Sequence, residues 1–142
     1  MKTEIFKQIF EVKGKDFGNA GKASTTIKTI LKDLGINPQI IRRVGIACYE
    51  AEMNMVMYAL QGTIEIQISP SMIVLFVDDK GPGIPDINLA MQEGFSTATE
   101  EIREMGFGAG MGLPNIKKNS DTLKILSEVN KGTRLEIGIN LN

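Results

Sequence analysis

Glycine is distributed unevenly along this chain. Seven of its fifteen glycines fall between positions 81 and 112. Glycine adopts backbone conformations that other residues avoid, so such a span favours loops over long helices or strands. We therefore expect loops of unusual geometry to dominate the third quarter of the chain. Residues 94–110, which are polar as well as glycine-punctuated, are predicted to form a lid.

The hydrophobic pattern of the remaining sequence predicts both strands and helices. Apolar residues alternate in some segments and recur at helical spacing in others. The predicted strands are 3–12, 63–68, 72–77, 123–129 and 133–139, and the predicted helices are 16–34, 37 to about 62, 86–92 and 111–119. Two hairpin-like strand pairs require antiparallel neighbours, so we expect an α+β two-layer α/β sandwich. Its sheet would be mixed and mostly antiparallel, with about three helices on one face.

Composition excludes several kinds of chemistry. The chain has no histidine and one cysteine, Cys48. Histidine bases, histidine metal ligands and a phosphohistidine relay are therefore excluded within this chain, as are an internal disulfide and a cysteine-based metal site. The carboxylate, amide, lysine and backbone groups that remain suit magnesium and phosphate sites.

Charge and hydropathy also limit the expected partners. Sixteen basic and seventeen acidic residues give a net charge of −1, so no basic excess points to nucleic acid or to an anionic membrane. The longest apolar run, 72–77, is far shorter than the ~20 residues that cross a bilayer. We therefore expect a cytoplasmic protein with no nucleic-acid or membrane partner. No repeat, low-complexity tract or linker interrupts the sequence, and residues 1–142 are predicted to form a single domain.

The first candidate for chemistry lies on the second predicted helix. Glu50 and Asn54 are four residues apart, so they stand on one helix face, one turn from each other. Glu50 and Glu52 are separated by about 200° of helix rotation, so both cannot face solvent if the helix is buried on one side. One of these carboxylates is expected to point toward the protein body or a pocket. The alternative is a solvated edge with no chemical role.

Two glycine motifs supply the other candidates. Asp79 follows a buried-looking strand and precedes Gly81 and Gly83, an arrangement that lets a ligand ring approach the backbone closely. The alternative is an ordinary tight turn. The glycines from 106 to 112 enter a predicted helix, where exposed N–H groups and the helix dipole favour an anion such as phosphate. The alternative there is a flexible linker, and the segment is neither a P-loop nor a dinucleotide fingerprint.

Taken in order, these motifs resemble those of the GHKL (Bergerat-fold, histidine-kinase-like) ATPase superfamily. The residues that carry the resemblance are Glu50 and Asn54 on a helix, then Asp79, Gly81 and Gly83, then Gly108, Gly110, Gly112 and Leu113, and finally Gly132 and Thr133. Within the superfamily, the chain is most similar to small bacterial serine kinases of the anti-sigma and stress-switch type. Residues 98–106 form a longer insert than that branch leads us to expect.

The resemblance implies roles for individual residues, with ATP and Mg²⁺ as cofactors. Asp79 would accept a hydrogen bond from the adenine amino group with support from Thr133, and Asn54 would bind Mg²⁺. Glu50 would be the catalytic residue, orienting and deprotonating an incoming hydroxyl. Other implied nucleotide contacts are Gly81, Gly83, Ile84, Ser96, Thr97, Arg103, Gly108, Gly110, Gly112 and Leu113.

The implied function is a regulatory serine/threonine kinase that transfers the γ-phosphate of ATP to a small partner protein of the anti-sigma-antagonist type. Two alternatives remain open. One is a nucleotide-dependent binding module that sequesters a sigma factor or another regulator. The other is an ATP sensor or slow hydrolase without protein-kinase activity. A homodimer is a further possibility, because the alternating first strand could pair across two copies.

Overall fold

The structure, a computed structural model, describes residues 5–84, 86–92 and 112–141. Its strands form one five-stranded sheet in the order β1-β2-β3-β5-β4. These strands are β1 (Phe6–Lys13), β2 (Gln61–Ile68), β3 (Met72–Lys80), β4 (Thr122–Glu128) and β5 (Gly132–Asn140). All four neighbouring pairs are antiparallel. The predicted α+β sandwich is therefore confirmed, with an antiparallel rather than a mixed sheet in the described part of the chain.

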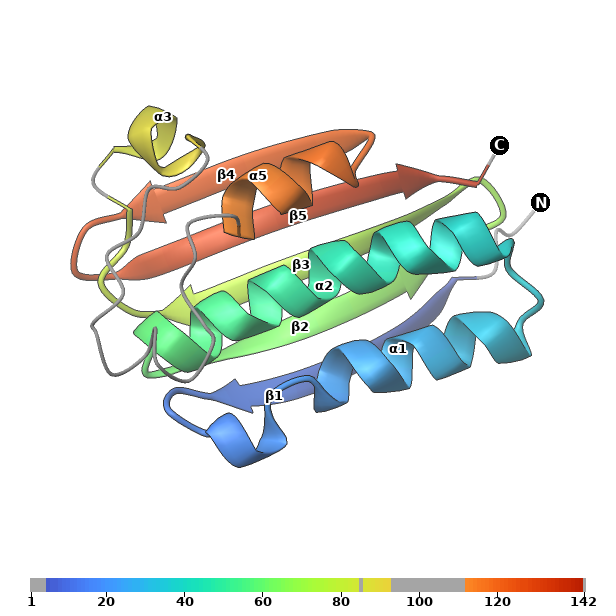
Figure 1. Ribbon diagram of the computed structural model, residues 1–142, viewed down its shortest axis with the longest axis horizontal. Helices are drawn as coiled ribbons and strands as arrows, with labels where there is room; N and C mark the ends of the chain where they lie inside the picture. The colour runs from blue at the N-terminus through green and yellow to red at the C-terminus, as the bar shows by residue number, and fades with distance from the viewer. Residues whose placement is uncertain (1–4, 85, 93–111, 142) are drawn as a thin grey trace.

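In the described part of the chain, the longer helices cover one face of this sheet (Figure 1). They are α1 (Lys22–Asp33), α2 (Pro38–Tyr58) and α5 (Gly112–Lys118), and a short helix, α3 (Ile87–Ala90), precedes the undescribed residues 93–111. Asn37 begins α2 by accepting a hydrogen bond from the Gln39 N–H at 2.8 Å, and Pro38 occupies the first turn. Across the described ranges, no helix has both the length and the apolar character needed to span a bilayer.

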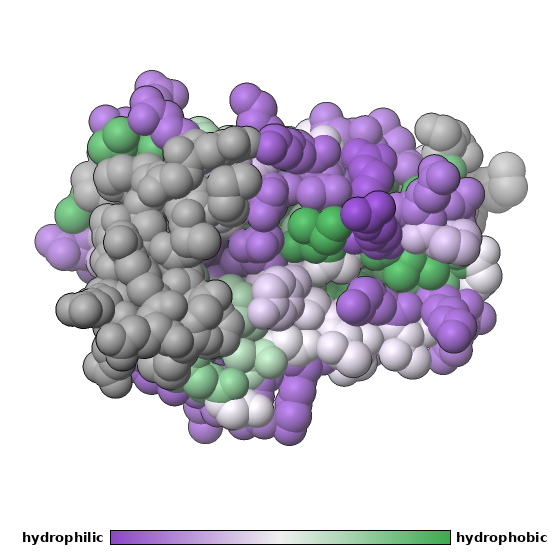
Figure 2. All heavy atoms as spheres, in the orientation of Figure 1, coloured by the Kyte–Doolittle hydropathy of each residue, from purple (hydrophilic) through white to green (hydrophobic). Residues whose placement is uncertain are grey.

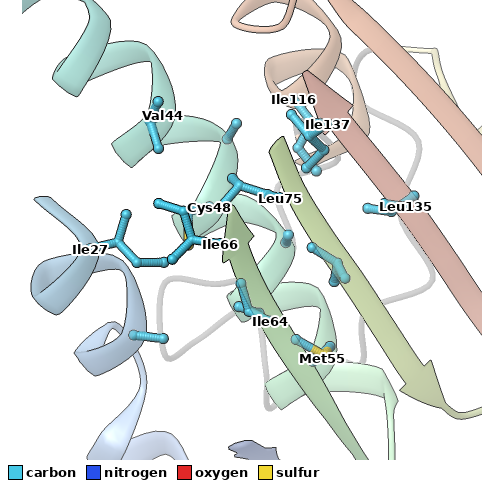
Figure 3. Packing of buried hydrophobic residues seen from close by; sticks show 14 of the residues in the cluster. Ile27, Val44, Cys48, Met55, Ile64, Ile66, Leu75, Ile116, Leu135 and Ile137 are labelled. Carbon is cyan, nitrogen blue, oxygen red and sulfur yellow. The ribbon is translucent and has the colours of Figure 1, made fainter. Parts of the chain in front are cut away.

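The core lies between the sheet and the helices. In β2, Ile64, Ile66 and Ile68 point toward the helices and are buried, while the residues between them are more exposed. This alternation follows from the strand period of two residues. Figure 3 shows how side chains from α1, α2, α5 and the central strands meet. Fully buried members of this core include Ile27, Val44, Cys48, Ile66, Leu75, Ile116 and Ile137.

The predicted helix over 16–34 is wrong at its N-terminal end. The structure has a 3₁₀ turn, η1 (Phe17–Asn19), after which Gly21 takes a φ of 95° and α1 begins at Lys22. The interruption has a tertiary cause. The Glu52 carboxylate, on α2, accepts hydrogen bonds from the backbone N–H groups of Gly21, Ala23 and Ser24 at 3.0, 3.2 and 3.0 Å. These contacts satisfy the free N–H groups of a helix that starts here.

The C-terminal end of α2 is set by the chain that precedes η1. Gly14 donates a hydrogen bond to the Leu60 carbonyl, and Lys15 donates one to the Val56 carbonyl. A Cβ at Gly14 would lie only 1.9 Å from the Ala59 oxygen, so only glycine allows this approach. The helix therefore ends at Tyr58, slightly before the predicted 60–62.

Candidate functional site

Asp79 is the penultimate residue of β3 and lies on the helix side of the sheet. Its side chain is half-buried, and one carboxylate oxygen, Oδ1, accepts a hydrogen bond from the Thr133 N–H at 3.1 Å. Burial raises the pKa of Asp79 above the ordinary aspartate value; the Thr133 N–H opposes this rise and the neighbouring Asp78 adds to it. The second carboxylate oxygen makes no hydrogen bond to any described residue, so it is free to accept one from a ligand.

Glycines hold the backbone close around this carboxylate. A Cβ at Gly132 would lie 2.0 Å from the Asp79 carbonyl oxygen, so β5 approaches β3 at a distance that only glycine permits. At Gly83, which has a φ of +75°, a Cβ would lie 2.4 Å from the Glu128 carbonyl oxygen. A Cβ at Gly81 would lie 3.3 Å from Asp79 Oδ1. Gly81 and Gly132 therefore lie against Asp79, whereas Gly83 lies against the end of β4.

Ser127 is a member of this group that the sequence analysis missed. Its Oγ accepts a hydrogen bond from the Ile84 N–H at 2.7 Å and lies 2.9 Å from the Thr133 Oγ1. The same hydroxyl lies 3.2 Å from the Gly132 carbonyl oxygen. Ser127 thus joins the loop after Asp79 to the start of β5. Only the pairing of Ser127 with Thr133 across β4 and β5 reveals this role, and pairing is not visible in the sequence.

Glu50 and Asn54 form a second group between α2 and the N-terminus of α5. A Cβ at Gly112 would lie 3.0 Å from the Asn54 Oδ1, so the two residues are in contact. Asn115, on α5, donates a hydrogen bond from Nδ2 to the Glu50 Oε1 at 3.4 Å. Asn115 was also missed. Both α2 side chains are half-buried, so each remains open to a ligand.

The carboxylates of α2 take opposite directions, as helix geometry required. Glu52 is 2% exposed and points toward α1, whereas Glu50 faces α5 and is half-buried. The prediction that one of the two points into the protein body is confirmed, and that residue is Glu52. Glu50 is therefore the carboxylate on this helix that is available for chemistry.

Both groups lie toward the same end of the sheet, where α2 packs on β2 beside Asp79. A Cβ at Gly62 would lie 2.4 Å from the Met55 sulfur and 3.1 Å from the Asp79 Cα. Met55 follows Asn54 directly, so the helix that carries Glu50 and Asn54 packs on β2 at Gly62, next to Asp79 of β3. In Figure 1 this is the left-hand end of the sheet, where α2 and β3 both terminate.

Not every predicted nucleotide contact can be placed. The predicted lid and the residues Ser96, Thr97, Arg103, Gly108 and Gly110 lie outside the described residues. Ile84 is half-buried and contacts Ser127 through its backbone, as described above. Leu113 is buried in the core where α5 packs on α2, so its side chain is part of the support for Gly112.

Asn54 fits a magnesium ion that is shared with a ligand. In the described ranges, no three acidic or cysteine side chains gather to form a metal site. The Asn54 amide makes no hydrogen bond to a described residue, which leaves its oxygen available. Magnesium in proteins is commonly held by one or two side-chain oxygens together with water and phosphate oxygens. The donor set thus suits a metal bound together with a nucleotide rather than by the protein alone.

Helices pack on one face of an antiparallel sheet in this protein. Asp79 and the pair Glu50 and Asn54 lie toward one end of that sheet. Together these features define a nucleotide-binding sandwich. Residues 39–142 match the family of histidine kinase-, DNA gyrase B- and HSP90-like ATPases. The chain belongs to this ATPase family, which is the GHKL superfamily that its motifs resemble.

Individual relatives are similar over most of their length. The serine/threonine-protein kinase RsbT of Bacillus subtilis (strain 168) is 31% identical over 113 residues, which cover 77% of this chain and 79% of the relative. An anti-sigma F factor of Clostridium kluyveri is 30% identical over 122 residues, 82% of each chain. An anti-sigma F factor of Thermoanaerobacter sp. (strain X514) is 32% identical over 120 residues, which cover 81% of this chain and 80% of the relative.

Ser127→Ala is expected to weaken ATP binding about three- to tenfold. The substitution removes the hydroxyl that joins Ile84 to Thr133, and one such hydrogen bond contributes about 0.5–1.5 kcal/mol. Titration calorimetry with ATP measures the effect. Ser127→Thr, which keeps a hydroxyl, should restore most of the affinity. Equal affinity of Ser127→Ala and the wild type would show that the contact has no part in binding.

Proposed function

We propose that this protein is a Mg²⁺–ATP-dependent serine/threonine kinase that phosphorylates a small regulatory protein. The observation that carries the proposal is the placement of Glu50 and Asn54 together on α2, facing the N-terminus of α5. A base and a metal-binding amide one helical turn apart are what transfer of a phosphoryl group to a hydroxyl requires. The similarity to RsbT and to the anti-sigma F factors supports the same conclusion.

In this proposal, Asp79 recognises the adenine base of ATP. Its free carboxylate oxygen accepts a hydrogen bond from the adenine amino group, since an ionised carboxylate accepts hydrogen bonds and donates none. Thr133 supports the same edge, and the backbone at Gly81, Gly83 and Ile84 lies beside the base. Residues proposed for the phosphate end are Ser96, Thr97, Gly108, Gly110, Gly112 and Leu113.

Glu50 and Asn54 act at the other end of the nucleotide. Asn54 would hold Mg²⁺, which neutralises phosphate charge when bound. Glu50 orients the acceptor hydroxyl and takes its proton as the oxygen forms a bond to the γ-phosphorus. The bond from that phosphorus to the β–γ bridging oxygen breaks, and ADP leaves. Most of the acceleration comes from positioning and charge neutralisation around the transferred group.

The same proposal includes the partner protein, the domain organisation, the cellular location and the oligomeric state. The regulatory partner would be of the anti-sigma-antagonist type or a sigma factor. We also propose that residues 1–142 form one ATPase domain that acts in the cytoplasm and pairs as a homodimer. The single sheet and shared core support the first of these, and the exposed Ile9 on the edge strand β1 supports the last.

Asp79→Asn is expected to weaken ATP binding about 10- to 100-fold, because it replaces a charged acceptor of the adenine amino group by a neutral one.

The unliganded Asp79→Asn variant should melt no lower than the wild type. Burial raises the pKa of Asp79 in the folded protein, so its contribution to stability is present at low pH and lost as the pH rises through that pKa. At neutral pH, the ionised group therefore costs stability that asparagine does not. Calorimetry with ATP and thermal melts of the unliganded proteins measure both effects, and an unchanged ATP affinity would contradict the assigned role.

Transfer of label from γ-³²P-ATP to purified acceptor proteins in the presence of Mg²⁺ tests the proposal directly. We expect label on a serine or threonine of one acceptor, and none with Asn54→Ala. Tight ATP binding with a stable partner complex but no label transfer would instead identify a nucleotide-dependent binding module. ATP hydrolysis without a labelled protein would identify a sensor or slow hydrolase.

A further inference from the structure

A second surface feature adjoins Glu50 on the outer side of the helices. A pocket of about 670 Å³ lies between α1 and α2, and Glu50 is one of the residues that line it. We call it the α1–α2 groove, defined by Lys22, Thr25 and Lys28 on α1 and by Arg42, Tyr49 and Glu50 on α2. The nucleotide roles proposed above use none of these residues except Glu50.

Small residues open this groove and an aromatic ring lines it. Gly45 lies where the two helices pass each other, and a Cβ there would come within 2.7 Å of the Lys28 side chain. Tyr49 is 43% exposed, and its ring lies beside Gly21, where α1 begins. Tyrosine and arginine, both of which line this groove, are enriched among the residues that anchor protein partners. In Figure 2, which views this face, pale residues over α1 and α2 have hydrophilic residues beside them.

The groove is positively charged although the chain is not. Lys22, Lys28 and Arg42 line it and are exposed, and Glu50 is its one acidic side chain among the lining residues. The whole chain carries a net charge of −1. A local excess of positive charge in a concave surface attracts an acidic partner and orients it on approach.

The positions of Arg42 and Glu50 on α2 set the distance between these two charged side chains along the groove. Arg42 and Glu50 are eight residues apart on one helix, which corresponds to about 12 Å along its axis. An extended chain covers that distance in about three to four residues. A peptide segment whose hydroxyl lies at Glu50 would therefore place the side chain three or four positions further along it beside Arg42. Lys28 lies against Gly45, between these two positions on α2.

We propose that the α1–α2 groove docks the acceptor protein through an acidic segment that flanks the phosphorylated residue. The hydroxyl lies at Glu50, and the partner's carboxylates lie at Lys28 and at Arg42, the latter about 12 Å from Glu50 along the helix axis. Tyr49 packs against the segment between them. This inference rests on the proposed kinase function and adds the charge and spacing of the substrate. The groove selects the partner, while the end of the sheet binds the nucleotide.

Fluorescence anisotropy with labelled serine peptides tests the proposal on the full chain with Mg²⁺–ATP. One peptide carries a pair of glutamates three and four positions before the serine, a second carries them after it, and a matched peptide carries lysines instead. We expect one of the glutamate peptides to bind at least about tenfold more tightly than the lysine peptide at low salt. Lys28→Glu combined with Arg42→Glu should reverse that preference and leave ATP affinity unchanged.

Lys124→Glu is the matched control, since this exposed lysine lies on β4, outside the groove. Equal binding of glutamate and lysine peptides, or unchanged binding by the double variant, would overturn the proposal. Displacement of the peptide by an oligonucleotide of equal charge at the same concentration would mean that the groove attracts any polyanion, and would overturn it as well.

The same double variant separates this inference from the proposed function. If it phosphorylates an acceptor protein with an unchanged KM, the docking proposal is wrong and the kinase proposal stands. If the wild type binds a glutamate peptide as expected but labels no acceptor, the kinase proposal is wrong and the docking surface stands.

Discussion

Glu50→Gln is expected to reduce phosphoryl transfer at least about 100-fold, because a positioned base contributes about 10²–10⁴ to such reactions. Glutamine keeps the size of the side chain and its contact with Asn115 but cannot take a proton at neutral pH. ATP affinity should stay within about twofold of the wild type, since Glu50 is assigned to the acceptor and not to the nucleotide. Single-turnover transfer of label to the acceptor protein measures the rate, and calorimetry measures ATP binding.

Glu11→Gln provides the matched control for this experiment. Glu11 is an exposed carboxylate on the edge strand β1 and pairs with Thr63 of β2, away from α5. Its replacement should leave the transfer rate unchanged. A Glu50→Gln protein that keeps more than half of the wild-type rate would show that Glu50 is not the base.

Glu52→Ala is expected to lower the free energy of unfolding by about 3–5 kcal/mol. The buried carboxylate accepts three backbone N–H groups where α1 begins, so its removal takes away three charged hydrogen bonds and leaves a cavity. Urea denaturation followed by circular dichroism measures the change. The denaturant slope should be unchanged, because the loss is one of stability and not of fold.

Glu50→Ala is the comparison for that result, since Glu50 lies two residues away on the same helix and is half-buried. Its effect on stability should stay below about 1 kcal/mol, because its one described hydrogen bond is long and neither residue is fully buried. Glu52→Gln should fall between the two, as the amide keeps one oxygen acceptor. A stability of Glu52→Ala within about 0.5 kcal/mol of the wild type would contradict the assigned structural role.

The sequence predicted the elements of this fold well, because most of them carry a clear apolar period. The alternation in residues 63–68 and the helical spacing after Pro38 each report one buried face, and both elements are found where expected. The segment 16–34 misled for a tertiary reason. Its spacing is helical throughout, but the Glu52 carboxylate captures the N–H groups near Gly21 and starts the helix there.

Within the candidate site, the residues that follow from local spacing were predictable and the ones that depend on register were not. Glu50 and Asn54 share a face because they are one helical turn apart. The contact of Asp79 with Thr133 had only the order of motifs to suggest it, and the structure provides the hydrogen bond. Ser127 and Asn115 act across strand and helix pairs, so nothing in their immediate sequence marks them.

The antiparallel order of the sheet also determines where a tag or label can be attached to this protein. β1 begins and β5 ends beside the β2–β3 turn, because Phe6 pairs with Ile68 and Asn140 with Met72. Asp79 lies seven residues further along β3 than Met72, about 23 Å away. Figure 1 shows both described ends of the chain on that remote side. A purification tag, fluorophore or surface tether attached at either terminus would therefore leave the opposite end of the molecule unobstructed for binding measurements.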